Sequence, residues 1–189
     1  MEKIYETAYA KINLGLDVLG KRSDGYHEVR MVMQSVGLSD AVEIEEGEGL
    51  VVETDHSGLA GGPDNLAWKA AELLARCCGK IPNVHIRLNK KIFLAAGLAG
   101  GSSDAAAVMR GLSRLWQLDL TAPELEKLAA ELGSDIPFCI TGGTALAEGR
   151  GEILTELPEA PELLLVLAKP KLEVATGWVY GNFRQQKVN

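Results

Sequence analysis

Cysteines are few in this 189-residue chain, and their positions suit neither cross-linking nor metal binding. The three thiols, Cys77, Cys78 and Cys139, form no disulfide framework and match no zinc-ligand spacing. We therefore expect free, buried thiols and a location in the reducing cytoplasm.

Long runs of basic or apolar residues are also missing. The net charge is −7 and no basic stretch is present, so a nucleic acid is not an expected partner. The first residues lack the basic start and apolar core of a secretory signal. The longest apolar run, Leu163–Ala168, is too short to cross a bilayer, so we expect no membrane association and interpret it as a strand buried on both faces.

A glycine-rich segment, residues 95–107, carries the clearest functional signal. It places Gly97, Gly100, Gly101 and two serines directly before an alanine-rich helical pattern. Glycine lets the backbone approach a ligand closely, and the N–H groups at a helix start attract anions, phosphates above all. The spacing is not G-x-G-x-x-G, and no lysine follows as in a P-loop. Lys90 and Lys91 could supply the missing positive charge, and the alternative is a small-residue turn that lets a helix pack closely on a sheet.

The remaining pattern predicts an α+β fold. Helices are expected over Leu66–Cys78, capped by Asp64-Asn65, over Ser103–Trp116, and from the Thr121-x-x-Glu124 capping box to Gly133. The expected strands are Ile4–Leu19 (one or two), Ala41–Glu45 with Leu50–Thr54 as its hairpin partner, Val84–Leu88 and Thr144–Ala147. Asp24-Gly25 predicts a tight turn, and Leu157–Pro161 predicts a linker.

Two charged residues are candidates for catalysis. Lys11 lies in a strand-like stretch with Asn13 two residues on, so both side chains share one face. Lys11 is either the outward residue of that strand or a charge beside a buried site. Asp135, between Gly133 and Pro137, is either a helix N-cap or a general base. Tyr26-His27 could stack on a ring and bind a base, or pack over a hairpin end.

Five motifs in chain order closely resemble the GHMP kinase superfamily, and within it the kinases that act on 4-diphosphocytidyl-2-C-methyl-D-erythritol in non-mevalonate isoprenoid synthesis. The resemblance covers about Ile4 to Tyr180. The motifs are Ala10-Lys11-Ile12-Asn13-Leu14, Asp24-Gly25-Tyr26-His27, Asp64-Asn65-Leu66, residues 96–106 and Gly133–Phe138.

The resemblance implies a site and a mechanism. Lys11 and Asp135 match the catalytic pair, with Asp135 accepting the proton of the substrate hydroxyl that attacks the γ-phosphate of ATP; Mg²⁺ is expected, with ligands that the sequence does not identify. The residues implied for ATP are Asn65, Leu66, Leu94, Ala95, Ala96, Gly97, Leu98, Ala99, Gly100, Gly101, Ser102, Ser103 and Asp104. Those implied for the cytidyl substrate are Asn13, Tyr26, His27, Thr176 and Tyr180.

The resemblance also implies the domain organisation. Residues 1–157 match the N-terminal, ATP-binding domain, a mixed sheet with packed helices like ribosomal protein S5 domain 2. Residues 158–189 match the beginning of a ferredoxin-like second domain that continues further in the family. Phe93 stands where the family loop usually begins with proline. The alternatives are a binding-only or inactive form, a kinase for a sugar, mevalonate or homoserine, and a purely structural domain.

Overall fold

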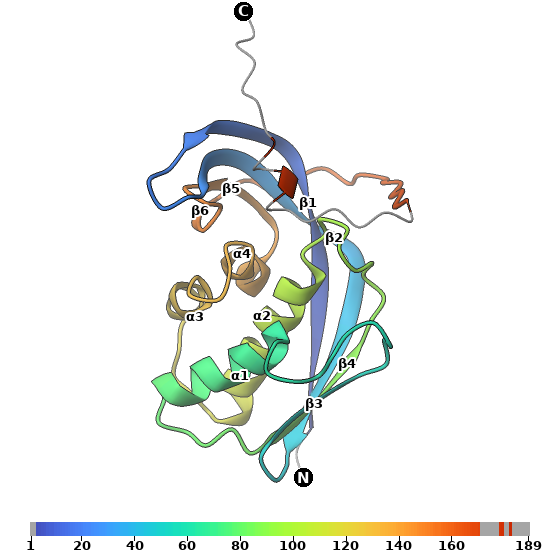
Figure 1. Cartoon of the computed structure of the whole chain (residues 1–189), viewed down its shortest axis with the longest axis vertical. Coiled ribbons are helices and arrows are strands. Elements are labelled where there is room, and N and C mark those ends of the chain that lie inside the picture. The colour runs from blue at the N-terminus through green and yellow to red at the C-terminus, as the bar shows by residue number, and fades with distance from the viewer. Residues whose placement is uncertain (1–2, 171–177, 180–181, 183–189) are drawn as a thin grey trace, which may run out of the picture.

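The computed structural model describes residues 3–170, 178–179 and 182. Strands β1 (Lys3–Lys21) and β2 (His27–Glu46) form a long antiparallel pair that runs the length of the molecule (Figure 1). The Asp24-Gly25 turn that joins them is confirmed: Gly25 has φ +87°, and the backbone N–H of Tyr26 donates to Asp24 Oδ1 at 3.0 Å.

Four shorter strands complete the mixed sheet. The two halves of β2 pair with different strands. Strand β4 (Val84–Asn89) pairs antiparallel with residues 41–46 of β2, and β5 (Thr144–Glu148) pairs antiparallel with residues 31–34. Strand β3 (Leu50–Thr54) lies parallel to β4, and β6 (Ile153–Glu156) lies antiparallel to β5. The predicted hairpin between 41–45 and 50–54 is therefore wrong, because β4 lies between those two strands.

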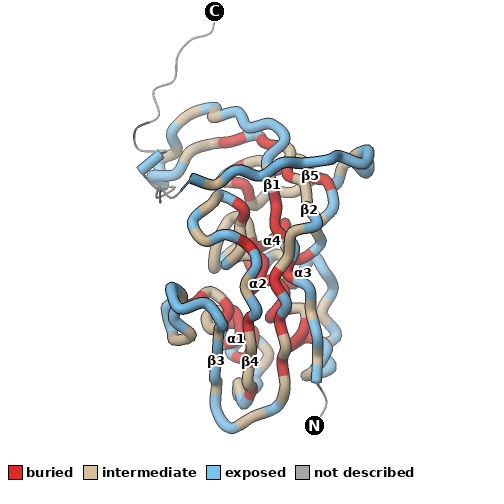
Figure 2. Tube along the Cα trace, turned by 90° about the vertical axis from the view of Figure 1, so that its right-hand side faces the viewer, coloured by how far each residue is buried: buried red, intermediate tan, exposed pale blue. Residues whose placement is uncertain are grey.

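The helices lie against one face of the sheet (Figure 1), and the buried residues gather between the two layers (Figure 2). Helix α1 (Leu66–Cys77) begins at its predicted cap, where Asn65 Oδ1 accepts the backbone N–H of Ala67 at 2.9 Å. Helix α2 (Gly100–Leu115) begins inside the glycine run, three residues before the predicted start. Helix α3 (Ala122–Ala129) has the predicted capping box but ends four residues before Gly133, and the short helix α4 (Ile136–Thr141) follows.

Helix α2 packs very closely on the sheet. Its residues 105–109 are buried, and a Cβ on Gly111 would lie 2.5 Å from Ile44 Cδ1. The expectation that small residues let a helix pack closely on the sheet is therefore confirmed for α2. It does not explain the loop that precedes α2.

A large bulge separates two halves of the β1–β2 pair. Tyr9 lies opposite Ser39 and Lys11 opposite Ser35, so residues 36–38 of β2 face Ala10 alone. The bulge shifts the alternation of buried side chains along β2. Before the bulge the buried residues of β2 have odd numbers, and after it they have even numbers, including Asp40. Ala10 and Lys11 are both buried although they are adjacent in sequence, as a bulge allows.

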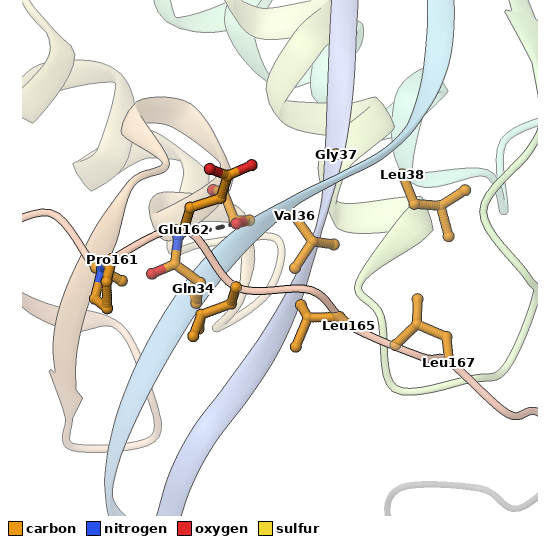
Figure 3. Close-up of a pocket in the computed structure, with 11 residues that line it drawn as sticks. Gln34, Val36, Gly37, Leu38, Pro161, Glu162, Leu165 and Leu167 are labelled. Carbon is orange, nitrogen blue, oxygen red and sulfur yellow. Dashed lines mark hydrogen bonds between the residues drawn. The ribbon is translucent and has the colours of Figure 1, made fainter.

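The apolar run Leu163–Ala168 is not the strand buried on both faces that was predicted. It forms no strand, and Leu164 and Val166 are 96% and 95% exposed. Leu165 and Leu167 instead line a cavity of about 470 Å³ against Val36 and Leu38 of the bulge (Figure 3). The run therefore has one partly covered face and one open face.

In the described part of the chain, no helix combines the length and hydropathy that a bilayer crossing requires. Cys77, Cys78 and Cys139 are free, as predicted, but the expected burial is wrong: Cys77 is exposed, and Cys78 and Cys139 are half-buried.

Candidate active site

The candidate site is a cavity of about 750 Å³ where β1, the β1–β2 turn, the glycine loop and the start of α4 meet. Seven of the residues predicted from the sequence line it together: Lys11, Asn13, Tyr26, His27, Gly97, Ser102 and Asp135. These residues come from four separate segments, which the fold brings to one place.

Lys11 is the most buried charge of this cavity. Its side chain is 7% exposed, and its Nζ lies 3.5 Å from Asp135 Oδ2 and 3.3 Å from Asn13 Oδ1. The outward-facing interpretation of Lys11 is therefore wrong. The bulge at Ala10 places this side chain in the interior, and the backbone N–H of Lys11 donates to Leu98 O of the glycine loop at 3.1 Å.

Asp135 stands at the N-terminus of α4 without capping it. Its backbone is helical (φ −84°, ψ −17°), and its side chain makes no cap hydrogen bond, so the N-cap interpretation fails for the carboxylate. The other end of α4 is held by Arg110 of α2, whose Nη1 donates to Cys139 O at 2.7 Å and Ile140 O at 3.3 Å. The Asp135 carboxylate, one third exposed, is left free to face Lys11 and the cavity.

The glycine loop and the start of α2 contribute Gly97 and Ser102 to the cavity wall. Ala95, Gly97 and Ala99 all have left-handed backbones, with φ of 50°, 72° and 57°. Ala99 is the N-cap residue of α2, and no side chain caps that helix. Because the first N–H groups of a helix lack intrahelical acceptors, this end of α2 attracts an anion.

Several residues implied for ATP do not line this cavity. Ser103 is buried and donates its hydroxyl to Tyr9 O, and Asp104 is buried and paired with Lys90. Asn65 is occupied as the α1 cap, and Leu66 lies within 3.5 Å of where a Gly101 Cβ would stand. Lys90, considered as a phosphate-binding cation, has a 1% exposed side chain that is not accessible from the cavity.

The thiol nearest this region is not reactive. Burial raises the pKa of Cys139 to about 11. Its Sγ lies 3.5 Å from Ser103 Oγ. The thiol therefore stays protonated near neutral pH and is a poor nucleophile.

At the outer end of the cavity, Tyr26 is 54% exposed, and the guanidinium of Arg150 lies 5.0 Å from its ring centroid. Sequence reasoning missed Arg150, Lys21 and Ser134, all of which line the cavity. Arg150 lies in the β5–β6 turn, and the pairing of β5 with β2 brings this turn beside the β1–β2 turn. No short sequence motif could have predicted that these two turns are neighbours. Thr176 and Tyr180 lie outside the described residues.

Among the described residues, no group of three or more His, Cys, Asp or Glu side chains is placed to hold a metal ion.

The comparisons with known proteins agree with this geometry. The profile described as the GHMP kinases N terminal domain matches residues 65–143, which include the glycine loop and Asp135. A relative from Acetivibrio thermocellus named 4-diphosphocytidyl-2-C-methyl-D-erythritol kinase is 48% identical over 190 residues, covering 100% of this chain and 67% of the relative. A relative of the same name from Synechococcus is 52% identical, covering 95% of this chain and 59% of the relative.

A solved structure gives the same result. The crystal structure of a 4-(cytidine 5'-diphospho)-2C-methyl-D-erythritol kinase superposes with a TM-score of 0.76 at 36% identity, covering 96% of this chain and 65% of that one. The chain thus spans roughly three fifths to two thirds of its relatives' length. The resemblance seen in the motifs is confirmed: the chain belongs to the 4-diphosphocytidyl-2-C-methyl-D-erythritol kinase family of GHMP kinases.

Proposed function

We propose that this chain transfers the γ-phosphoryl group of ATP to the 2-hydroxyl of 4-diphosphocytidyl-2-C-methyl-D-erythritol. One observation carries the proposal: a Lys11–Asp135 pair, 3.5 Å apart, shares a cavity with the glycine loop at the uncapped start of α2. In this proposal a base for the hydroxyl and a site for the phosphates would therefore be adjacent.

The phosphates of ATP would bind at the glycine loop. Gly97 and Ser102 line the cavity, and the N–H groups at the start of α2 supply donors and the positive end of the helix dipole. We propose that residues 94–104 act together here, some through backbone N–H groups and some, such as Asp104, as support from behind. Asn65 and Leu66 at the start of α1 would border the adenine.

Asp135 would act as the general base. The hydroxyl oxygen forms a bond to the γ-phosphorus, the bond from that phosphorus to the ADP oxygen breaks, and the hydroxyl proton passes to the Asp135 carboxylate. Lys11 would stabilise the ionised carboxylate and offset the negative charge of the transferring group. Asn13, which accepts from Lys11 Nζ, would orient that ammonium.

Magnesium fits this arrangement as an ion held by the nucleotide. Mg²⁺ usually keeps several waters and binds phosphates with few protein oxygens, so the absence of a ligand cluster among the described residues is compatible with it. Ser102 is the loop hydroxyl on the cavity wall. When bound, the ion would neutralise phosphate charge.

The cytidyl end of the substrate would lie between the two turns. Tyr26 offers an exposed ring for stacking, and His27 lines the same wall. Arg150 and Lys21 add positive charge to this end of the cavity, which suits a diphosphate. Thr176 and Tyr180 would form the second wall.

We also propose that residues 1–157 are the nucleotide-binding and catalytic unit and that residues 158–189 begin a second one. All six strands and helices α1–α4 fall within residues 3–156, whereas 158–170 contain neither. A small phosphorylated substrate and three free thiols fit action in the cytoplasm.

The test is phosphoryl transfer from γ-labelled ATP by the wild type and Asp135→Asn, with ATP and CDP affinities measured by calorimetry. We expect Asp135→Asn to keep both affinities and lose roughly 10²–10⁴-fold in turnover, the usual contribution of a general base. The matched control is Asp119→Asn, an exposed carboxylate in the α2–α3 connection that should change nothing.

Normal turnover by Asp135→Asn would remove Asp135 from the mechanism. Binding of both ligands by the wild type without transfer would indicate a binding-only form. Transfer to mevalonate, homoserine or a sugar, but not to the cytidyl substrate, would indicate another GHMP kinase activity.

A further inference from the structure

Three buried charges lie beside the glycine loop: Asp40 of β2, Lys90 directly after β4, and Asp104 of α2. Their side chains are at most 1% exposed, and Lys90 Nζ donates to Asp40 Oδ2 and to Asp104 Oδ2. None of the three lines the candidate cavity. Their side chains nevertheless connect the segment before the glycine loop to the helix after it.

Asp40 holds the segment that leads into the loop. Its Oδ1 accepts the backbone N–H groups of Lys91 and Ile92, the latter at 2.8 Å. Asp104, in the second turn of α2, holds the helix that leads out of the loop. Lys90 bridges the two carboxylates, and its Nζ lies 3.7 Å from where a Cβ on Gly100 would stand. The bridge therefore lies immediately below the start of α2.

The loop above needs such support because its backbone is strained. Ala95 and Ala99 adopt left-handed conformations that cost a residue with a Cβ about 1–2 kcal/mol each. Strained backbones persist only where the surrounding structure fixes them. The middle of the loop is fixed by Leu98, whose carbonyl accepts from Lys11 N and whose side chain is buried with Ala10 and Ile92. The charge cluster fixes the two ends.

Stability alone is a weak explanation for this cluster. Burying an ion pair costs desolvation energy, and apolar replacements are often as stable. Here two carboxylates share one ammonium, and Asp104 Oδ1 is buried with no hydrogen-bond partner among the described residues. Such a cluster contributes little to folding stability. Its role is better explained by the positions in which it holds the glycine loop and the start of α2.

We infer that Asp104, through Lys90 and Asp40, is a positioning residue that sets the glycine loop and the start of α2 in the geometry that binds the nucleotide phosphates. The inference rests on the proposed function for the identity of the ligand. Removing the link should weaken ATP binding while leaving the cytidyl end of the cavity intact.

The experiment compares Asp104→Ala with Asp104→Asn, which retains an oxygen for Lys90. The control is Glu6→Ala, which removes the ion pairs of α2 through Arg110 and Arg114 at the other end of the same helix. For each folded variant, calorimetry gives the affinities for ATP and for CDP, and hydrogen exchange gives the opening of backbone amides 97–103. Should Asp104→Ala not fold, the shorter, uncharged side chain of Lys90→Gln takes its place.

We expect Asp104→Ala to bind ATP about 3- to 30-fold more weakly, the range for residues that act on a site without touching its ligand. Its loop amides should exchange faster, and CDP affinity should not change. Asp104→Asn should recover most of the ATP affinity, and Glu6→Ala should lower thermal stability without changing either loop exchange or ATP binding.

Unchanged ATP affinity and unchanged loop exchange in folded Asp104→Ala would overturn the inference, as would equal effects from Glu6→Ala. A wild-type chain that binds no ATP would count against the proposed function instead. In that case the exchange comparison alone decides the inference, because it needs no ligand.

Discussion

Arg150 is a cation of the site whose side chain contacts both Tyr26 and Glu152. Its guanidinium lies over the Tyr26 ring, and its Nε lies 3.4 Å from Glu152 Oε1. We predict that Arg150→Gln weakens binding of CDP about tenfold or more, because a hydrogen bond to a charged group is worth about 1.5–3 kcal/mol. Cytidine, which has no phosphate, should lose little affinity; calorimetry with the two ligands separates the effects.

The control for that prediction is Arg30→Gln. Arg30 lies on β2 and pairs with Glu148 at 2.9 Å, but it does not line the cavity. Equal losses for CDP and cytidine in Arg150→Gln would show that Arg150 supports Tyr26 rather than binding phosphate.

The residues that sequence reasoning found, and those it missed, differ in a physical way. Lys11 and Asp135 lie in short motifs whose spacing within the chain is enough to suggest a role. Arg150 enters the site only through strand pairing. Lys90 was considered as a free cation, but Asp40 and Asp104, 50 and 14 residues away in the sequence, bury it. A local sequence pattern does not predict ion pairs between residues so far apart in the sequence.

At the scale of elements, the packing of α2 on the sheet gives a direct test. Alanine is favoured over glycine inside a helix by about 1 kcal/mol. A methyl group on Gly111 would nevertheless meet Ile44 at 2.5 Å. We predict that Gly111→Ala lowers the free energy of unfolding by up to about 2 kcal/mol in chemical denaturation, because an overpacking cost of about 1–3 kcal/mol outweighs the gain in helix propensity of about 1 kcal/mol.

The comparison variant for the same substitution is Gly37→Ala, since a Cβ there meets nothing within 4 Å. Its stability should stay within about 1 kcal/mol of the wild type. A Gly111→Ala protein as stable as the wild type would mean that α2 shifts freely on the sheet. The placement of Asp104 would then be less firmly fixed than the inference requires.

Helices were predictable because caps and apolar spacing are local features, as at Asn65 for α1. Strand partners were not, because the sequence alone does not reveal that β4 lies between β2 and β3. The run at 163–168 was misassigned because an apolar segment has the same composition whether it forms a central strand or lies over a cavity. Its alternating exposure, high at Leu164 and Val166, is a property of packing alone.

For the whole molecule, the buried cluster predicts how stability depends on pH. Burial raises the pKa of Asp104 from 3.8 to about 7, and the nearby Lys90 opposes that shift. Between about pH 4 and pH 7 the folded chain therefore holds a proton that the unfolded chain has released. The contribution of Asp104 to the free energy of unfolding is full below about pH 4 and is lost as the pH rises through about 7.

Asp104→Asn isolates this contribution, because the other titrating groups are common to both proteins. We predict that the free energy of unfolding of the wild type, minus that of Asp104→Asn, falls from pH 5 to about pH 7 in chemical denaturation and levels off above that pH. A difference that stays constant would mean that Asp104 is ionised throughout, its charge balanced by Lys90. If the Lys90 ammonium instead lowered the pKa of Asp104 below its ordinary 3.8, the difference would also stay constant from pH 5 to pH 8 and would rise with pH only below about pH 4. Whether this free-energy difference falls or stays constant with pH thus shows which charge state of Asp104 supports the start of α2.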